Sequence, residues 1–240
     1  MSKIELNVLA KDLDNAVAVT QAAEGNVYVG VLTKNFDTVD EAVAQVKAYT
    51  AAGVRVSVGL GAGDPAMWRR VVDVSVATLP AHVNQVYPAA GLTVGALEVA
   101  GATDTWVNAL ITPGSKPGLV RVGTGPNSVG FDGEVSAEQA AALVAEVGIA
   151  SVKFYPIGGT TQLDHLTAMV KAAVAAGVPI FEPTGGIDVE NYDVVVSTCL
   201  EAGATHVVPH IYTSIVDKAS GNTIPELVTL LNEKSAALLS

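Results

Sequence analysis

The chain has 240 residues, half of them hydrophobic and 15% charged, and this composition excludes an intrinsically disordered protein. Its 13 basic and 24 acidic residues give a net charge of −11, which argues against nucleic acid or an anionic membrane surface as a partner. No apolar run reaches the roughly 18 residues of a membrane span, and no signal peptide is recognisable. The single cysteine, Cys199, cannot form an internal disulfide, so we expect a cytoplasmic protein.

One unit recurs along the chain: a helical stretch ends in glycine and a strand follows within a few residues. The glycines that end these stretches are Gly25, Gly53, Gly101, Gly148, Gly177 and Gly203. Strands are predicted near residues 4–10, 26–33, 54–61, 82–88, 106–112, 151–156, 179–183 and 206–212. Capping-box spacing predicts helix starts at Thr38 with Glu41, Ser136 with Gln139, and Thr161 with Asp164.

Eight strands that alternate with helices indicate a parallel sheet. A single (β/α)₈ barrel domain over residues 1–240 is the simplest architecture, and an open doubly wound sheet is the alternative. Residues 113–135 are rich in glycine and proline and are predicted to form a long functional loop or a small hairpin after the fifth strand. Barrels of this size often associate, so a homo-oligomer is expected.

Lys153 lies among apolar neighbours in the sixth predicted strand. A surface lysine is one interpretation. The other follows from the burial of both faces of a barrel strand, which leaves an enclosed amine with a lowered pKa, suited to Schiff-base chemistry.

The segment PTGGID (183–188) ends the seventh predicted strand, where phosphate sites of barrels frequently form. Gly185 and Gly186 free two backbone N–H groups, and Asp188 is placed to cap the next helix. An ordinary glycine-rich turn is the alternative interpretation.

Together, SVKFYP (151–156) and PTGGI (183–187) resemble the two-keto-3-deoxy-6-phosphogluconate aldolases, class I lyases on a (β/α)₈ barrel. Most of the chain is similar to one branch of that family, the aldolases of glucosaminate catabolism. The runs that carry this similarity are LNVLA (6–10), VGLGAGDP (58–65), HVNQV (82–86), EPTGGIDVENY (182–192) and PHIYTSIVDKASGNT (209–223).

The resemblance implies cleavage of a phosphorylated keto sugar acid, 2-dehydro-3-deoxy-6-phosphogluconate, into pyruvate and glyceraldehyde 3-phosphate. It also suggests 4-hydroxy-2-oxoglutarate as a second substrate. It implies that Lys153 is the Schiff-base lysine, and that Thr184, Gly185 and Gly186 hold the substrate with the glycine amides on its phosphate.

Lys34 falls where the better-known branch has an arginine that binds the substrate carboxylate. Four residues earlier, that branch has a glutamate as general base, whereas this chain has Gly30. The base must therefore come from another residue.

Glu182 is the predicted replacement. It shares a strand face with Thr184 by alternation, and its apolar neighbours Ile180 and Phe181 are expected to raise its pKa. An ion pair with Lys153 that only tunes the lysine's charge is the alternative.

Four further polar residues lie at or just after the ends of predicted strands. Asn84 or Gln85 can reach substrate hydroxyls, but alternation allows only one of them inward. His210 is either a phosphate-binding or proton-transfer group or a core histidine, and Ser214 can donate to phosphate.

No metal-binding motif or nucleotide-binding fingerprint is recognisable, and an iminium needs no cofactor as electron sink. Two other functions stay open from the residues alone: a sugar-phosphate isomerase or epimerase that forms no imine, and a non-catalytic sugar-phosphate binder.

Overall fold

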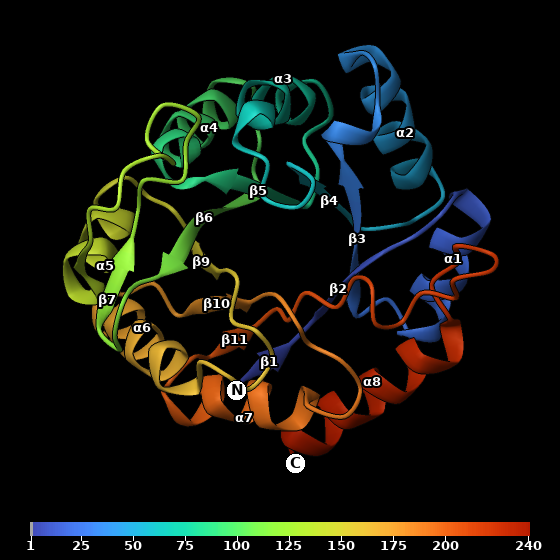
Figure 1. Cartoon of the computed structure of the whole chain (residues 1–240). Helices are drawn as coiled ribbons and strands as arrows, with labels where there is room; N and C mark the ends of the chain where they lie inside the picture. The colour runs from blue at the N-terminus through green and yellow to red at the C-terminus, as the bar shows by residue number, and fades with distance from the viewer. Residues whose placement is uncertain (1) are drawn as a thin grey trace.

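The computed structural model describes residues 2–240, whose strands form a ring enclosed by helices (Figure 1). The strands are β1 (Lys3–Ile4), β2 (Leu6–Leu9), β3 (Val27–Leu32), β4 (Val56–Gly59), β5 (His82–Val86), β6 (Trp106–Pro113), β7 (Leu119–Arg121), β8 (Val135–Ser136), β9 (Ser151–Phe154), β10 (Ile180–Pro183) and β11 (His206–Val207). The helices are α1 (Leu13–Ala22), α2 (Val39–Ala51), α3 (Trp68–Thr78), α4 (Tyr87–Val99), α5 (Ala137–Glu146), α6 (Leu163–Ala175), α7 (Tyr192–Glu201) and α8 (Pro225–Leu238).

Parallel pairing closes this ring in the order β1-β11-β10-β9-β6-β5-β4-β3-β2. Only Glu5 separates β1 from β2, so the two are halves of one barrel strand. Lys3 pairs with His206 on one side of the break, and Asn7 pairs with Tyr28 on the other. The predicted (β/α)₈ barrel is therefore confirmed, and the open sheet is wrong.

Strand alternation separates an apolar layer from a polar interior. Val29, Val83 and Phe181 are buried in the apolar core that joins the strands to the surrounding helices. The residues between such positions point into the barrel, and an unusual number of them carry amide, hydroxyl, imidazole or carboxyl groups.

The polar interior is held by a chain of hydrogen bonds through buried side chains. Asn7 Nδ2 and Asn84 Nδ2 both donate to Ser57 Oγ, at 3.1 and 2.8 Å. Asn108 Nδ2 donates to Asn84 Oδ1 at 2.9 Å. A buried polar group is costly unless it is paired, so this connected network makes a polar barrel core tolerable.

A second polar cluster fills the amino-terminal end of the barrel around the buried carboxylate of Glu5. Tyr28 Oη donates to Glu5 at 3.1 Å, His206 Nε2 lies 2.8 Å from the carboxylate and Lys3 Nζ 2.9 Å from it, and Arg55 makes a further ion pair. Burial alone raises the pKa of Glu5, but its contacts with His206, Arg55 and Lys3 outweigh burial and hold that pKa below its usual range.

Residues 113–135 form an antiparallel extension of the barrel rather than an irregular loop. Thr112 of β6 pairs with Arg121 of β7, and Val120 pairs with Val135 of β8. Of the two predicted alternatives, the small hairpin is confirmed.

Two of the three predicted helix starts carry the expected cap. Thr38 and Glu41 form a reciprocal capping box at α2, and Ser136 Oγ accepts from the Gln139 amide at α5. The prediction at Thr161 is wrong, because its hydroxyl instead donates to the Gly158 carbonyl at 3.0 Å in the tight turn that precedes α6.

The predicted cap at Asp188 also needs correction. The α7 helix begins at Tyr192, and the Asp188 carboxylate accepts from the Asn191 amide at 2.9 Å in the turn before it. None of the helices within residues 2–240 combines the length and apolar character needed to cross a membrane.

Candidate active site

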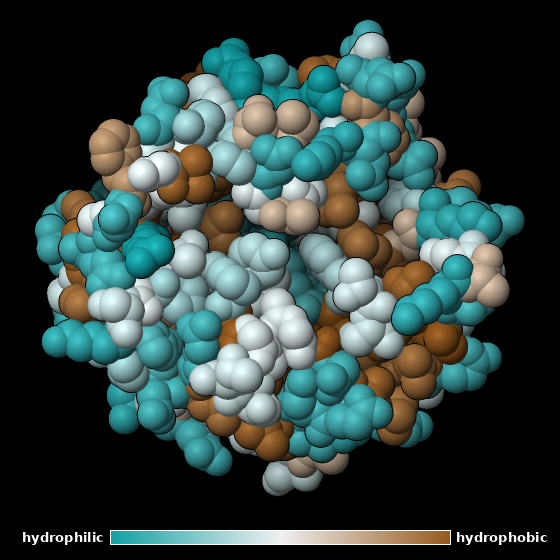
Figure 2. All heavy atoms as spheres, viewed as in Figure 1, coloured by the Kyte–Doolittle hydropathy of each residue, from teal (hydrophilic) through white to brown (hydrophobic). Residues whose placement is uncertain are grey.

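A cavity of about 490 Å³ opens at the carboxyl ends of the barrel strands, where a hollow lies at the centre of the face in Figure 2. Its lining changes in character around the barrel. The side formed by β2, β3, β4 and β6 is apolar and contributes Leu9, Leu32, Leu60 and Leu110. The opposite side, formed by β9, β10, β11 and the loops that follow them, is polar and contributes Lys153, Thr184, Gly185, Gly186, His210 and Ser214.

Lys153 extends from β9 into this cavity, so the interpretation as a surface lysine is wrong. Its Nζ donates to Asn84 Oδ1 at 3.1 Å and lies 3.3 Å from His210 Nδ1. Burial lowers the pKa of Lys153 to about 8, against the opposing effect of the Glu182 charge. The lowered pKa leaves more free, nucleophilic amine near neutral pH than an ordinary lysine has.

Glu182 pairs with Lys153 in the register of β10 and β9, but it is fully buried and does not line the cavity. Oε1 accepts from Ser151 Oγ at 2.7 Å and lies 3.3 Å from His82 Nε2. Oε2 accepts from Asn108 Nδ2 at 2.8 Å and from His210 Nε2 at 2.7 Å. Both oxygens are thus occupied by protein groups. Glu182 can therefore act on a molecule in the cavity only through a residue that it contacts, such as His210.

The predicted rise in the pKa of Glu182 is wrong. Burial does act to raise that pKa, but the contacts with His82 and His210 outweigh burial and hold it well below the usual range. Phe181 packs into the outer apolar core and leaves the carboxylate among hydrogen-bond donors. Glu182 is therefore an ionised acceptor rather than a carboxyl poised to exchange protons.

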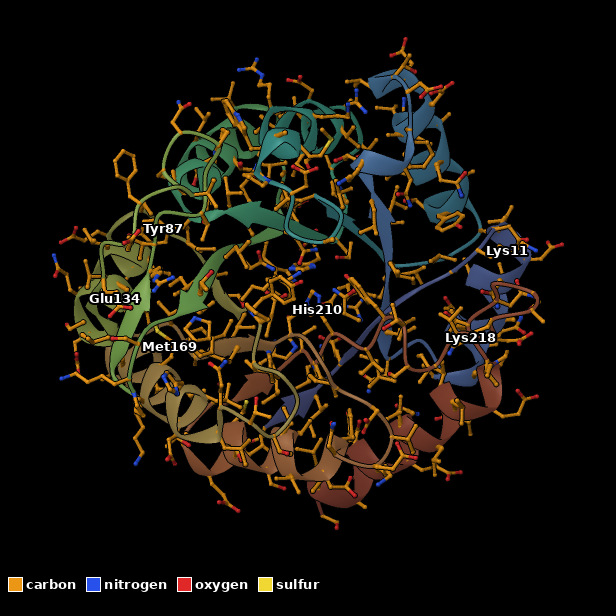
Figure 3. All side chains as sticks on the ribbon, viewed as in Figure 1. Lys11, Tyr87, Glu134, Met169, His210 and Lys218 are labelled. Atoms are coloured by element: carbon orange, nitrogen blue, oxygen red, sulfur yellow. The ribbon has the colours of Figure 1, made fainter. Side chains whose placement is uncertain are left out.

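His210 follows β11 and lies at the centre of the barrel, between β2 and β10 (Figure 3). Because the Glu182 carboxylate is an acceptor, the hydrogen bond to it places the imidazole proton on Nε2. The unprotonated Nδ1 therefore faces Lys153 and the cavity. Burial, reinforced by the positive charge of Lys153, lowers the pKa of His210 to about 3, so its ring is neutral.

The glycine turn after β10 presents free backbone amides to the cavity. Gly185 and Gly186 have φ angles of 102° and 74°, and within residues 2–240 their N–H groups have no protein acceptor. Ser214 Oγ donates to the Ile187 carbonyl at 2.8 Å and ties the loop after β11 to this turn. Clustered N–H groups of this kind bind anions.

A second set of free amides lies in the loop after β4. Gly61, Ala62 and Gly63 line the cavity with φ angles of 97°, 49° and 70°, and their N–H groups have no acceptor among the described residues. The glycines of this loop are visible in VGLGAGDP, but the sequence alone did not predict a binding element here.

Asn84 and Gln85 point in opposite directions, as alternation requires. Asn84 faces Lys153 in the barrel, whereas the Gln85 amide turns outward to the Trp68 carbonyl and Thr93 Oγ1, at 3.0 and 3.1 Å. Both residues line the cavity, but only the side-chain amide of Asn84 faces Lys153.

Lys34 is not brought to the site with Lys153. Its Nζ lies 2.7 Å from the Asp64 carboxylate, the side chain is half exposed, and the residue does not line the cavity. Asp64 also caps the short helical turn at Pro65, so the ion pair lies on the rim.

Gly30 stands where the better-known branch has its glutamate. A Cβ atom at this position would lie 2.8 Å from Leu9 Cδ2 and 3.5 Å from the Tyr212 hydroxyl, so a larger residue here would require the Leu9 side chain to move.

Four residues of the site were missed in the sequence: His82, Asn108, Ser151 and Tyr212. A signal existed for two of them, because Ser151 shares the strand parity of Lys153, and Asn108 pairs with Ser151 in the register of β6 and β9. That register is a property of the assembled sheet, so the sequence alone did not reveal it.

Two comparisons of the sequence with known proteins point to the same family. A family model described as KDGP aldolase matches residues 1–219. A protein of Salmonella typhimurium (strain 14028s / SGSC 2262), named 2-dehydro-3-deoxy-phosphogluconate aldolase, is 43% identical over 238 residues, covering 99% of this chain and 96% of the relative.

Solved structures with low sequence identity share the barrel. KGPDC from Streptococcus mutans has a TM-score of 0.58 at 11% identity, with 100% of both chains covered. N-(5'-phosphoribosyl)anthranilate isomerase from Pyrococcus furiosus has a TM-score of 0.59 at 13% identity, covering 98% of this chain and 99% of that one. At such identities the likeness concerns the fold alone.

Proposed function

Because this chain belongs to the KDGP aldolase family, we propose that it is a class I aldolase that forms a Schiff base through Lys153. We propose 2-dehydro-3-deoxy-6-phosphogluconate as its substrate, cleaved to pyruvate and glyceraldehyde 3-phosphate. Family membership shows a lyase, so the isomerase and the non-catalytic binder are excluded. The observation that carries the proposal is a lysine amine of lowered pKa in the polar half of the cavity.

The chemistry begins with the free amine of Lys153, which attacks the C2 keto carbon of the substrate. Loss of water from the carbinolamine gives a protonated imine. This cation accepts the electrons of the C3–C4 bond as the bond breaks, which leaves an enamine of pyruvate and an aldehyde. Protonation at C3 and hydrolysis then release pyruvate and restore the amine.

The two anionic ends of the substrate need two binding elements, yet Lys153 is the only lysine or arginine among the described residues that line the cavity. The amides of Gly185 and Gly186, beside Ser214, suit the phosphate. The amides of residues 61–63 suit the carboxylate and take the place expected for Lys34, whose charge is paired with Asp64.

Borohydride reduction in the presence of pyruvate tests the Schiff base, because it fixes an imine as a stable secondary amine. We expect mass spectrometry to find one reduced pyruvate on Lys153 of the wild type and none on K153A or K153R. Both variants should also lose cleavage, because alanine has no amine and arginine stays protonated. K171R, on α6, is the control and should be trapped normally. Trapping at another lysine, or full cleavage by K153A, would contradict the proposal. The cytoplasmic location and the homo-oligomer stay predictions.

A further inference from the structure

Three side chains from neighbouring strands form a relay that ends at the reacting nitrogen. The Glu182 carboxylate accepts from His210 Nε2 at 2.7 Å, and His210 Nδ1 lies 3.3 Å from Lys153 Nζ. Ser151 and Asn108 donate to the same carboxylate at 2.7 and 2.8 Å, which fixes its position. The hydrogen bonds therefore aim one unprotonated nitrogen, Nδ1, at the place where the substrate becomes attached.

We propose that His210 is the proton-transfer residue of the aldolase reaction, and that Glu182 is a positioning residue that orients the imidazole and stabilises its charged form. This inference rests on the Schiff base proposed above. It moves the acid–base role from the carboxylate to the imidazole, which, unlike Glu182, lines the cavity.

The distance from the reacting atoms favours His210 as the proton-transfer residue. In the imine, C3 lies two bonds from Nζ and the C4 hydroxyl oxygen four bonds from it, so both lie close to a group that contacts Nζ itself. Tyr212, the nearby alternative in the same loop, donates its hydroxyl to Asn7 Oδ1 at 3.2 Å. Burial raises the pKa of that hydroxyl further, so it is a poor proton acceptor.

The proton and the electrons balance with this single residue. His210 Nδ1 takes the proton of the C4 hydroxyl, the electron pair of that O–H bond forms the second bond of the aldehyde carbonyl, and the C3–C4 electrons form the enamine double bond as the imine nitrogen becomes neutral. The imidazolium then returns the proton to C3, which regenerates the imine of pyruvate for hydrolysis. No other proton carrier is required between cleavage and protonation.

The charge of the site stays constant through these steps. A cationic imine beside a neutral imidazole becomes a neutral enamine beside an imidazolium, with the Glu182 carboxylate anionic throughout. The positive charge of Lys153 is one of the causes that lower the pKa of His210 in the resting enzyme. Once cleavage removes that charge from the nitrogen, the carboxylate dominates and the imidazole becomes more basic, at the step that needs a base.

Exchange of the pyruvate methyl protons with deuterated water isolates this step, because it needs the imine and the base but no carbon–carbon cleavage. We expect H210N to be trapped by borohydride with pyruvate as the wild type is, yet to exchange about 10²–10⁴-fold more slowly. H210A should regain part of its exchange when imidazole is added to the buffer, a rescue that a purely structural role would not give.

E182Q tests the positioning role. Glutamine retains the size of the side chain but removes the charge that stabilises the imidazolium. We expect kcat and the exchange rate to fall, whereas the pyruvate concentration for half-maximal trapping changes less than about twofold.

H206N is the matched control. His206 is also a barrel histidine that contacts a buried glutamate, Glu5, at 2.8 Å, but it lies at the amino-terminal end, away from the cavity. We expect its exchange rate to equal that of the wild type even if its stability falls.

The outcomes separate the two proposals. If the wild type forms no imine with pyruvate, the Schiff base proposed for Lys153 is wrong. If the wild type is trapped and exchanges, and H210N exchanges at the same rate, the relay is wrong and a water or the Thr184 hydroxyl is the base. If E182Q changes half-maximal trapping and stability but leaves kcat intact, Glu182 has a structural role only.

Discussion

At the scale of single residues, the free-amine fraction of Lys153 limits how fast the imine forms. Its pKa of about 8 reflects burial, partly offset by the Glu182 charge. The groups that face the amine are Asn84, from β5, and the neutral His210, after β11. The rate of reductive trapping should therefore rise with pH and level off above about 8, because the neutral amine is the nucleophile.

The same arrangement predicts the direction of a shift in E182Q. Because the carboxylate charge raises the pKa of Lys153, its removal should move the midpoint of the trapping profile to lower pH. The measurement is the initial trapping rate between pH 6 and 10 in both proteins. An unchanged or higher midpoint would mean that Glu182 does not act on the amine electrostatically.

Lys153 could be identified in the sequence because a lone charge in an apolar strand is conspicuous. The strand face of Glu182 could also be predicted, but its pKa could not, because alternation reveals which way a side chain points and not which groups surround it. The residues that lower the pKa of Glu182 are His82 of β5 and His210 after β11, and neither is close to it in the sequence. Such cross-barrel contacts depend on the closure of the sheet.

At the scale of elements, Ser214 ties the loop after β11 to the turn after β10, and the proposed phosphate site uses both. Substitution of Gly186 is a poor test of it, since a Cβ there would lie 2.6 Å from the Gly159 nitrogen and displace the turn itself. Ser214 is exposed and offers a gentler change.

S214D places a negative charge beside the proposed phosphate amides. We expect the KM for 2-dehydro-3-deoxy-6-phosphogluconate to rise about 10- to 150-fold, the scale of losing 1.5–3 kcal/mol from a charge-assisted contact. Cleavage of 4-hydroxy-2-oxoglutarate, which has no phosphate, serves as the comparison, and S214A as the neutral control. An equal rise for both substrates would place the phosphate elsewhere.

Helix starts show the limit of local patterns at this scale. At Thr38 and Glu41 the spacing does give a cap, and the Glu41 carboxylate accepts from the Thr38 amide and also from the Asp37 amide. At Thr161 the same spacing gives no cap, because the hydroxyl donates a hydrogen bond to the carbonyl of Gly158 instead. The pattern identifies the residues that can cap, and the neighbouring turn decides whether they do.

At the scale of the whole molecule, the Glu5 cluster links the first barrel strand to β3, β11 and the residue before β4. The folded pKa of Glu5 is depressed, so its contribution to stability is complete above the unfolded pKa near 4.5 and is lost as the pH falls toward the folded value. Over that window the unfolded chain takes up a proton that the folded chain does not.

E5Q should therefore flatten the acid side of the stability profile. We expect the free energy of unfolding of the wild type to fall more steeply below pH 4.5, by up to about 1.4 kcal/mol per pH unit for the one proton involved. Urea unfolding at pH 5, 4 and 3 measures this slope, with E98Q as a control that removes an exposed carboxylate from α4. Equal slopes in E5Q and the wild type would show that Glu5 is not held ionised.

The alternation of strands and helices was enough to predict the barrel, because in most units a glycine marks the end of the helix and an apolar segment marks the following strand. The polar filling of the barrel was harder to foresee. Asn7, Ser57 and Asn108 look like ordinary polar residues within their own strands, and only the assembled ring joins them into one network.

The division of the first strand at Glu5 has a consequence for protein synthesis. The β1 half finds its partner only at His206. Ribosomes add about 5–20 residues per second, so roughly 10–40 s separate the synthesis of Lys3 from that of its pairing partner. Throughout that interval the nascent sheet has unpaired edges, which are templates for association with other chains. We therefore expect slower translation upstream of residue 206 to prolong this exposure.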